Sequence, residues 1–576
     1  MKKKRHFNDL LVPVILTVCI LPFVTRMAVY DYGYSKYDWH SDNSILEDFY
    51  TYYKINIFYV ILFFAAAILV LRLLLYRQKT KSWKIFIPLF SYGLFAIIST
   101  ICSVNIWNSI TGHFVDGEGI GVILGYIVIA FYSYQIMVEE NDYKTLINAI
   151  TVMFLCESEG GWCQVFKHDL LNYEWMQKIV MNSEQFKNYG GTVSDIFTGN
   201  NVYLTLGNPN YAAEFLVMFD CVFAVMAIYS NSKKETVKYI ILLADSLILT
   251  WYTYTRTAIV SLIVTAIMVI IFGTMKTVRT KNISGVLSKG KMYAFVGGVI
   301  CGTVIVLVTV DYISGSRYSG RIIDSKKDNR LELIETESDG VKILFEGKVY
   351  RFNIQDVLQN EGGDNKYSLP FDAEGYVEVQ NDGAQDVLVI CFEGNILEFV
   401  YDNQQDKYLY RSSWGKDVDM KDVPKIDFGG YEYLGSGRLY IWSRIIPKLG
   451  TYIIKGSGPE TFAEIFPQDD YTGKIIYAGK PARIIERAHN DYIMKWVQNG
   501  FIAMISMVGF YIIFIRKCIN GYLNMSFGSV RDMLGYGSFV ACISYMVCGL
   551  FIDSTIYVTP VFFVFVGVAL SAVNQK

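Results

Sequence analysis

Charged residues are scarce in this sequence. Asp, Glu, Lys and Arg make up 18% of its 576 residues, whereas hydrophobic residues make up 52% and aromatic residues 15%. An average soluble domain has about 25% charged residues. The composition therefore excludes an ordinary soluble protein and indicates a membrane protein. The net charge of −2 carries no further information, because the charges are grouped along the chain.

Cysteine and histidine patterns that bind metals or form disulfides are also missing. Nine of the ten cysteines lie in apolar stretches, and only Cys391 lies in a polar region. This distribution offers no disulfide framework. Neither CxxC nor HxxxH spacing occurs among the ten cysteines and five histidines, so we expect no metal site and no cofactor.

Long apolar stretches, by contrast, are abundant. A membrane span needs about 20 apolar residues, and twelve stretches qualify: 9–29, 55–75, 83–104, 119–138, 145–166, 211–230, 239–254, 257–275, 292–312, 491–515, 533–552 and 556–574. The fold class that we predict is an all-α polytopic membrane protein with about 12 transmembrane helices. The stretches 239–254 and 257–275 have lysines and arginines at both outer ends, so we expect a hairpin with its turn at T253-Y-T-R-T257.

The positions of basic residues predict the orientation. Lysine and arginine gather on the cytoplasmic side of a membrane, and they occur at K2-K-K-R5, between Arg72 and Lys84, and between Lys276 and Lys291. Both chain ends are then cytoplasmic. Residues 1–312 hold helices 1–9 and residues 491–576 hold helices 10–12. The segments 30–54, 167–210 and 313–490 are long and external.

The first part of the third external segment, 318–430, reads as a small β-rich insertion. Its alternating stretches include 342–352, 376–383, 387–392, 397–401 and 407–410, the period of two that strands show. E346-G347 and N381-D-G383 fit hairpin turns. Cys391 falls on an inward position of this alternation, and we expect it in the core of the insertion.

The remaining part, 435–489, is basic and is the predicted catalytic loop. We expect a short helix over 435–449, capped by Ser436, with Arg438 in its first turn. An arginine beside the free N–H groups of a helix start forms a site for an anion such as phosphate. Taken alone, Arg438 also fits an interfacial arginine that extends its charge toward water.

Arg256 and His489 are the other two candidate catalytic residues. Arg256 lies in the turn between two spans, where an unpaired charge costs about 2 kcal/mol or more, so it needs a phosphate or a carboxylate such as Glu157 or Glu159. His489 precedes the stretch 491–515, and a helix N-terminus favours neutral imidazole, the form that accepts a proton. A single interfacial histidine is the simpler explanation of His489 by itself. The candidate substrate-binding residues are Asn208, Asn210, Arg444, Arg487 and Asn490.

Five motifs occur in a fixed order along the chain: L206-G-N-P-N-Y-A-A213, T255-R-T-A258, G435-S-G-R-L-Y-I-W442, G456-S-G-P-E-T-F462 and R487-A-H-N-D-Y492. Together with the expected topology, their order resembles the O-antigen ligase and O-antigen polymerase superfamily of bacterial membrane glycosyltransferases. The resemblance covers roughly 200–515 without the β-rich insertion. Thr255 stands where the family more often has serine.

The resemblance implies a transferase that works outside the bacterial cytoplasmic membrane. It takes a glycan from a polyprenyl-diphosphate carrier to a hydroxyl of a glycan, lipid or protein acceptor, without a metal ion and with inversion. Arg256 and Arg438 would hold the diphosphate, and His489 would be the general base. The lipid bilayer is then a partner and nucleic acid is not.

Two other classes of function stay open. A flippase for lipid-linked oligosaccharides would also have many spans, although such carriers tend to show internal repeats, and we find none in this sequence. A sensor would act through the β-rich insertion. The roles of four acidic residues in or beside the spans are open as well: Glu157, Glu159, Asp220 and Asp245.

Overall fold

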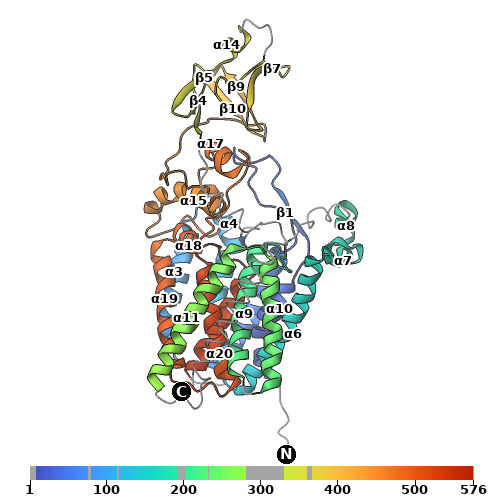
Figure 1. Ribbon diagram of the computed structural model, residues 1–576, viewed down its shortest axis with the longest axis vertical. Helices are drawn as coiled ribbons and strands as arrows, with labels where there is room; N and C mark the ends of the chain where they lie inside the picture. The colour runs from blue at the N-terminus through green and yellow to red at the C-terminus, as the bar shows by residue number, and fades with distance from the viewer. Residues whose placement is uncertain are drawn as a thin grey trace, which may run out of the picture.

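The computed structural model describes residues 8–74, 80–112, 116–190, 201–230, 232–280, 330–359 and 366–574. A helical bundle forms one end of the molecule and a β domain the other, with the large loops between them (Figure 1). Within these described ranges, five helices are long and apolar enough to cross a membrane: α2 (Tyr52–Leu74), α3 (Ile87–Ile101) with the short helix before it, α9 (Pro209–Tyr229), α11 (Arg256–Thr280) and α19 (Phe501–Tyr522). These helices support the expectation of a membrane protein.

Other helices complete the bundle. They are α5 (Ile120–Ile136), α6 (Glu140–Val165), α10 (Lys233–Tyr252), α20 (Val530–Cys548) and α21 (Thr559–Val573). Helix α21 is buried along its whole length and packs with α5, α19 and α20, so it lies at the centre. The expected span 292–312 and the start of the insertion, 318–329, lie outside the described residues.

The expected hairpin near Arg256 is confirmed. Helix α10 ends at Tyr252 and α11 begins at Arg256. The connection between them contains Tyr254 in the left-handed region, with φ of 53°. Arg256 is therefore the first residue of its helix.

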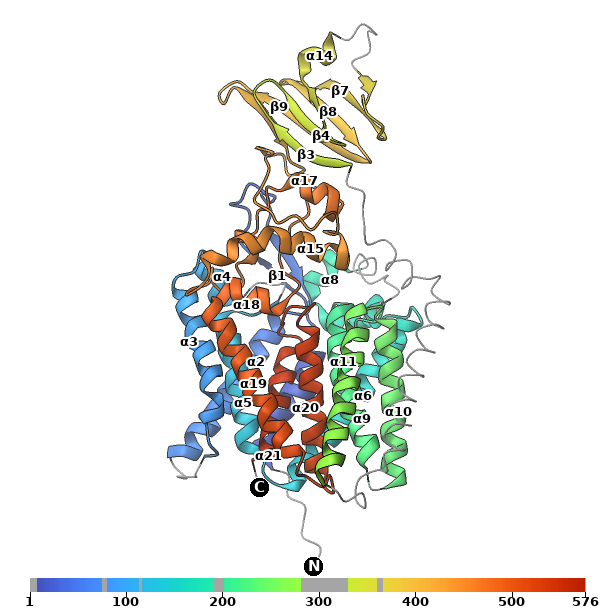
Figure 2. The ribbon, with the colours of Figure 1, turned by 60° about the vertical axis from the view of Figure 1, so that its left-hand side comes forward.

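The expected span 491–515 is wrong in its first part. The structure has a separate helix α18 (Asp491–Asn499), followed by α19, which begins at Phe501. Gly500 between them has φ of 95°, a conformation that few residues other than glycine adopt. Helix α18 also carries the buried charges of Asp491 and Lys495, so it belongs to the loop region above the bundle (Figure 2).

The β domain consists of two antiparallel sheets. The first contains β3 (Leu331–Thr336), β4 (Val341–Phe345) and β5 (Lys348–Phe352). The second has the order β11-β10-β9-β8-β7-β6, with β6 (Lys366–Ser368), β7 (Gly375–Asn381), β8 (Asp386–Phe392), β9 (Asn395–Asp402), β10 (Lys407–Arg411) and β11 (Asp417–Val418). The predicted strands are confirmed, and so is the turn at Glu346 and Gly347, which have φ of 48° and 72°.

The expected core position of Cys391 is wrong. In β8, Leu388, Ile390 and Phe392 enter the main core of the domain, so Cys391 points to the opposite face, where it is partly exposed. The reason is that β8 is apolar on both faces, with Val387 and Val389 buried on the second one. Alternation cannot select the core face of such a strand.

Side chains from two loops hold the β domain above the bundle. Tyr471 and Ile475 are part of the core of the domain, and the hydroxyl of Thr472 accepts a hydrogen bond of 3.0 Å from the N–H of Ile334. On another side, Lys416 donates to the carbonyl oxygen of Tyr37 at 3.0 Å. The domain is thus attached both to the predicted catalytic loop and to the first long loop.

Both ends of the described chain lie at the end of the bundle opposite the β domain. The amide of Asn8 donates to Asp142 at 3.1 Å, and the amide of Asn574 donates to the hydroxyl of Tyr134 at 2.8 Å. Asp142 and Tyr134 flank the connection between α5 and α6. The first and last described residues are therefore close together, far from the loops that carry the site.

Candidate active site

The connection between α20 and α21 joins two motifs that are far apart in sequence. The carbonyl oxygen of Phe551 accepts a hydrogen bond of 3.1 Å from Nε of Arg438. Two residues further on, the carboxylate of Asp553 accepts from the backbone N–H groups of His489 and Asn490, each at 2.9 Å. Arg438 and His489 are thus fixed to the same short segment, which we call the anchor segment (Phe551–Asp553).

The backbone of His489 has an unusual conformation, with φ of 51°. A residue other than glycine in the left-handed region is uncommon and often marks a functional site. The carboxylate of Asp553, whose side chain is 2% exposed, holds this turn and lies 3.6 Å from Nδ1 of the ring. The ring keeps 37% of its side-chain surface exposed, so one face is open to a substrate.

The surroundings of His489 favour neutral imidazole. The desolvation of the ring by the surrounding loops lowers the pKa of His489 to about 3, with further lowering by the guanidinium groups of Arg438, Arg487 and Arg483. Both causes act in the same direction, since burial and the nearby cations each disfavour a positive charge on the imidazole ring. The surrounding protein therefore acts in the direction that was expected from the helix N-terminus, toward neutral imidazole.

Arg438 is positioned by a strained turn. Gly435, Ser436 and Gly437 all have positive φ, of 69°, 62° and 86°, so regular helix α15 (Leu434–Ile445) starts only at Arg438. The expected cap by Ser436 is therefore wrong, because a left-handed residue cannot take the extended conformation of an N-cap. Nη1 of Arg438 donates to the carbonyl of Gly435 at 2.8 Å.

The charge of Arg256 lies close to that of Arg438. The pKa of Arg438 lies below its usual value, mainly because the side chain is buried. The negative charge of Asp553 raises this pKa, and the positive charge of Arg256 lowers it. Nη2 of Arg438 makes no hydrogen bond to the residues that the structure describes, which leaves a donor for a ligand. The charge of Arg438 thus acts on both Arg256 and His489, and an anion near Arg438 would relieve the repulsion between the two cations.

Helix packing fixes the position of Arg256. The hydroxyl of Thr255 donates to the carbonyl of Pro209 at 3.4 Å, and Ser261, one and a half turns after Arg256, bonds the hydroxyl of Ser544 at 2.7 Å. Glu157, one of the carboxylates considered as a partner of Arg256, accepts a hydrogen bond from Thr205 at 2.5 Å instead.

A second carboxylate, that of Asp116, forms an ion pair with Arg487. Its side chain is 3% exposed and lies 3.3 Å from Nη1 of Arg487, whose guanidinium group also stacks over the ring of Tyr211. Burial raises the pKa of Asp116 well above its usual value, and Arg487 lowers it. Arg487 is thus held beside the anchor segment by an ion pair.

A buried network of charges connects helix α18 with the segment that follows Asp553. Nζ of Lys495 lies 2.9 Å from Asp491 and 3.5 Å from Glu118, and it donates to Ser554 at 2.5 Å. Burial lowers the pKa of a lysine, but Asp491 and Glu118 raise the pKa of Lys495 well above its usual value. This network fixes α18 and the residue after Asp553 to each other.

Sequence reasoning missed Asp553 and Asp116. Asp553 lies 64 residues after His489, between the expected spans 533–552 and 556–574. The signal was a carboxylate at the boundary of two apolar stretches, where an unpaired charge is costly, but only the fold shows which groups it meets.

Three of the other candidate residues have structural partners. Arg444 is 4% exposed and forms a 2.8 Å ion pair with Asp470. Asn208 caps α9 by accepting from the N–H of Asn210 at 2.8 Å. Asn490 caps α18 by accepting from Tyr492 and Ile493, and its amide donates to Leu550 at 3.0 Å. These three side chains therefore have structural roles. Asn210 is half-buried.

Two acidic residues of the spans also find partners. Asp245 accepts from the hydroxyl of Ser158 at 2.5 Å and from the indole of Trp162 at 2.7 Å. Asp220 accepts from the hydroxyl of Thr250 at 3.1 Å. Both carboxylates therefore have a structural role between helices.

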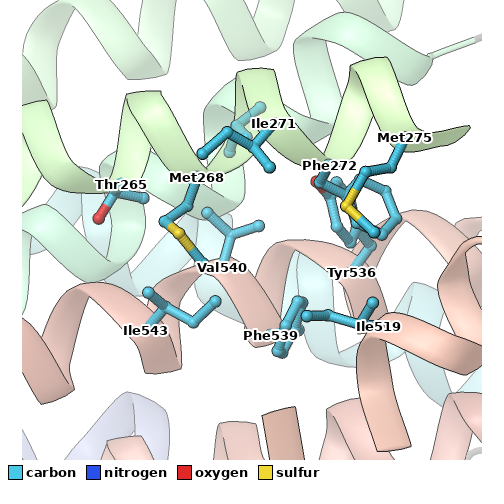
Figure 3. A pocket seen from close by; sticks show the side chains of 11 residues that line it. Thr265, Met268, Ile271, Phe272, Met275, Ile519, Tyr536, Phe539, Val540 and Ile543 are labelled. Carbon is cyan, nitrogen blue, oxygen red and sulfur yellow. The ribbon is translucent and has the colours of Figure 1, made fainter. Parts of the chain in front are cut away.

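A small cavity lies elsewhere, within the bundle. Side chains from α11 and α20, among them Met268, Phe272 and Val540, face one another across it (Figure 3). Its volume is about 40 Å³, too small for a sugar. Among the described residues, no group of three or more His, Cys, Asp or Glu side chains gathers as a metal site.

No protein-family model matches this chain, and no curated protein is similar to it at a significant level. Its function must be inferred from the arrangement of its own residues.

Proposed function

We propose that this protein is a membrane glycosyltransferase of the O-antigen ligase and polymerase type. It transfers a glycan from a polyprenyl-diphosphate carrier to the hydroxyl of an acceptor. The observation that supports the proposal is the attachment of both Arg438 and His489 to the anchor segment, with the charge of Arg256 acting on Arg438.

The proposal includes a topology. About 12 helices cross the bacterial cytoplasmic membrane, with both chain ends inside and the β-rich insertion outside. Support comes from the position of the described chain ends beside the α5–α6 connection and from the loops and β domain at the other end of the bundle (Figure 2). The site then faces the extracytoplasmic side, where lipid-linked glycans are used.

The chemistry needs one base and a counter-charge for the leaving group. His489 removes the proton of the acceptor hydroxyl as its oxygen bonds to the anomeric carbon and the bond to the carrier diphosphate breaks. The proton ends on the imidazole and the electron pair on the diphosphate, and attack opposite the diphosphate inverts the anomeric centre. A positioned base supplies about 10²–10⁴-fold in rate.

The arginines stabilise the departing diphosphate. Fixed cations in a site that excludes water act strongly on charge that develops in the transition state. Arg438 keeps Nη2 available for this purpose, and the nearby charge of Arg256 adds to it. Two guanidinium groups provide the positive charge that a magnesium ion provides in other phosphate chemistry, so the mechanism requires no metal.

The test uses purified protein in lipid nanodiscs, a labelled polyprenyl-diphosphate glycan, and glycan, lipid and peptide acceptors. Wild-type protein forms a labelled product, and His489→Ala and Arg256→Ala each lose at least about 100-fold in rate. Lys480→Ala is the control, because Lys480 is an exposed cation of the same loop. Undiminished transfer in both variants would overturn the proposal, and movement of intact donor across a vesicle membrane would favour a flippase.

A further inference from the structure

A second cavity, of about 440 Å³, lies near the loop end of the bundle. Its walls come from α6, the turn Leu170–Asn172, α7 (Glu174–Val180) and two segments at 23–25 and 204–205. The volume is in the range of small-molecule sites. Arg256, Arg438 and His489 do not line it, so it is separate from the candidate active site.

The walls of this cavity are mainly apolar. The aliphatic, aromatic and methionine side chains in the walls are those of Phe23, Leu170, Leu171, Met176, Ile179, Val180 and Leu204. Such walls favour a hydrocarbon chain, because the removal of apolar surface from water stabilises the bound state.

Two polar atoms in these walls have no partner. The side chain of Glu157 is 1% exposed, and its Oε1 accepts from Thr205. Its Oε2 makes no hydrogen bond to any residue that the structure describes, and neither does the hydroxyl of Thr25. A buried polar atom without a hydrogen bond destabilises the protein, so a ligand that donates a hydrogen bond here would be favoured.

The rim of the cavity has the character of a lipid boundary. Ile179, which lines the cavity, is 65% exposed, and Leu155 and Trp175 nearby in sequence are 48% and 54% exposed. Exposed aliphatic and tryptophan side chains at a helix end are typical of the membrane interface. The exposed side chain of Ile179 therefore gives the cavity an apolar edge at the surface of the molecule.

The charges in the walls restrict the head group of such a molecule. Three acidic residues, Glu157, Glu159 and Asp169, line the cavity. They outnumber the buried cation of Lys54, whose Nζ donates to the carbonyl oxygen of the lining residue Thr205 at 3.1 Å. Carboxylates repel a head group with net negative charge.

We propose that this cavity binds a membrane lipid by its apolar chain, and that a neutral or cationic head group donates a hydrogen bond to Oε2 of Glu157. Two lipid sources share this chemistry: the ammonium group of an ethanolamine phospholipid and the free hydroxyl of a diacylglycerol. An anionic glycerol phospholipid does not fit.

Gly160 provides a sharp test. It lines the cavity, and a Cβ atom added there meets no atom within 4 Å. A leucine at this position therefore fills the cavity without disturbing the helix. Gly509→Leu is the matched control, because its Cβ also meets no atom within 4 Å and it lies on α19, away from the cavity.

The experiment measures bound lipid by native mass spectrometry. Purified full-length protein is mixed separately with dioleoylphosphatidylethanolamine, dioleoylglycerol and dioleoylphosphatidylglycerol. Wild-type protein and Gly509→Leu retain the first or the second at least about tenfold more than the third, and Gly160→Leu and Glu157→Gln lower this retention about tenfold. The better retained lipid identifies the source.

Equal retention of all three lipids by wild-type protein overturns the proposal, as does unchanged retention in Gly160→Leu. Thermal unfolding of each variant shows whether a loss reflects unfolding, and Gly160→Leu keeps the hydrogen bonds of Glu157 intact. The measurement does not depend on glycan transfer, so its result is independent of the proposed function.

Discussion

The neutral state of His489 is the residue-scale property from which the proposed chemistry follows. Burial disfavours a positive charge on the ring, and three arginines disfavour it further. A histidine in water would lose half of its base form near pH 6.5. His489 stays a base at much lower pH.

The first prediction concerns pH. Because the pKa of His489 is lowered to about 3, the transfer rate of the wild-type protein should show no loss from histidine protonation between about pH 8 and pH 5. Arg438→Gln removes one of the cations that lower this pKa, so the acid limb of the profile should move to higher pH. The measurement is kcat/KM against pH, with Lys480→Gln as the control. An unshifted acid limb in Arg438→Gln would contradict the account.

The second prediction concerns Asp553, a positioning residue for His489. Asp553→Asn keeps the shape but replaces one acceptor oxygen with a donor, so one of the two N–H groups at His489 and Asn490 loses its bond. We expect kcat to fall about 10–100-fold with little change in KM, because the base moves while the phosphate groups still bind. Asp469→Asn, at a half-exposed carboxylate of the same loop, should leave both constants unchanged. A rise in KM alone would point to a role in donor binding.

At the scale of elements, the sequence predicted those turns whose conformation depends on neighbouring residues in the chain. The turn before Arg256 and the hairpin at Glu346 and Gly347 follow from basic flanks and turn residues, and both are present. The break at Gly500 and the conformation of Ser436 depend on what these segments pack against, so sequence periodicity did not reveal them. The same holds for the site, since the sequence offered Arg256, Arg438 and His489 but not the anchor segment that joins two of them.

The third prediction concerns Gly456, whose position is fixed by close packing against another segment of the backbone. Its motif runs against the end of α18, where Ser457 donates to the carbonyl of Val497 at 2.8 Å. A Cβ atom at Gly456 would overlap the carbonyl of Gln498. Gly456→Ala should therefore lower stability by about 1–3 kcal/mol, visible as a lower Tm, and reduce transfer through displacement of α18. Gly450→Ala, where a Cβ meets no atom within 4 Å, should change neither.

At the scale of the whole molecule, the β domain shares its core with the predicted catalytic loop, because Tyr471 and Ile475 of that loop pack in it. The N–H of Thr336, at the end of β3, donates to the carbonyl of Met420 at 3.0 Å. These two positions are adjacent, so the segment 337–419 can be replaced by a short linker.

The fourth prediction follows from this geometry. Replacing 337–419 with a short glycine–serine linker should preserve part of the transfer activity, because none of the candidate catalytic residues lies in the deleted segment. The loss should reflect the exposed side chains of Tyr471 and Ile475, which pack in the core of the domain. The check is the labelled-donor assay with the Tm of the same sample. A folded deletion protein without any transfer would indicate that the domain itself performs the function, as in a sensor.

The anchor segment has one more consequence. Phe551 and Asp553 are separated by a single residue, yet one receives the guanidinium of Arg438 and the other the backbone of His489. The spacing between the side chain of Arg438 and the backbone of His489 is therefore set by a stretch of three amino acids. An insertion of a single residue at Ile552 would change this spacing without altering either side chain.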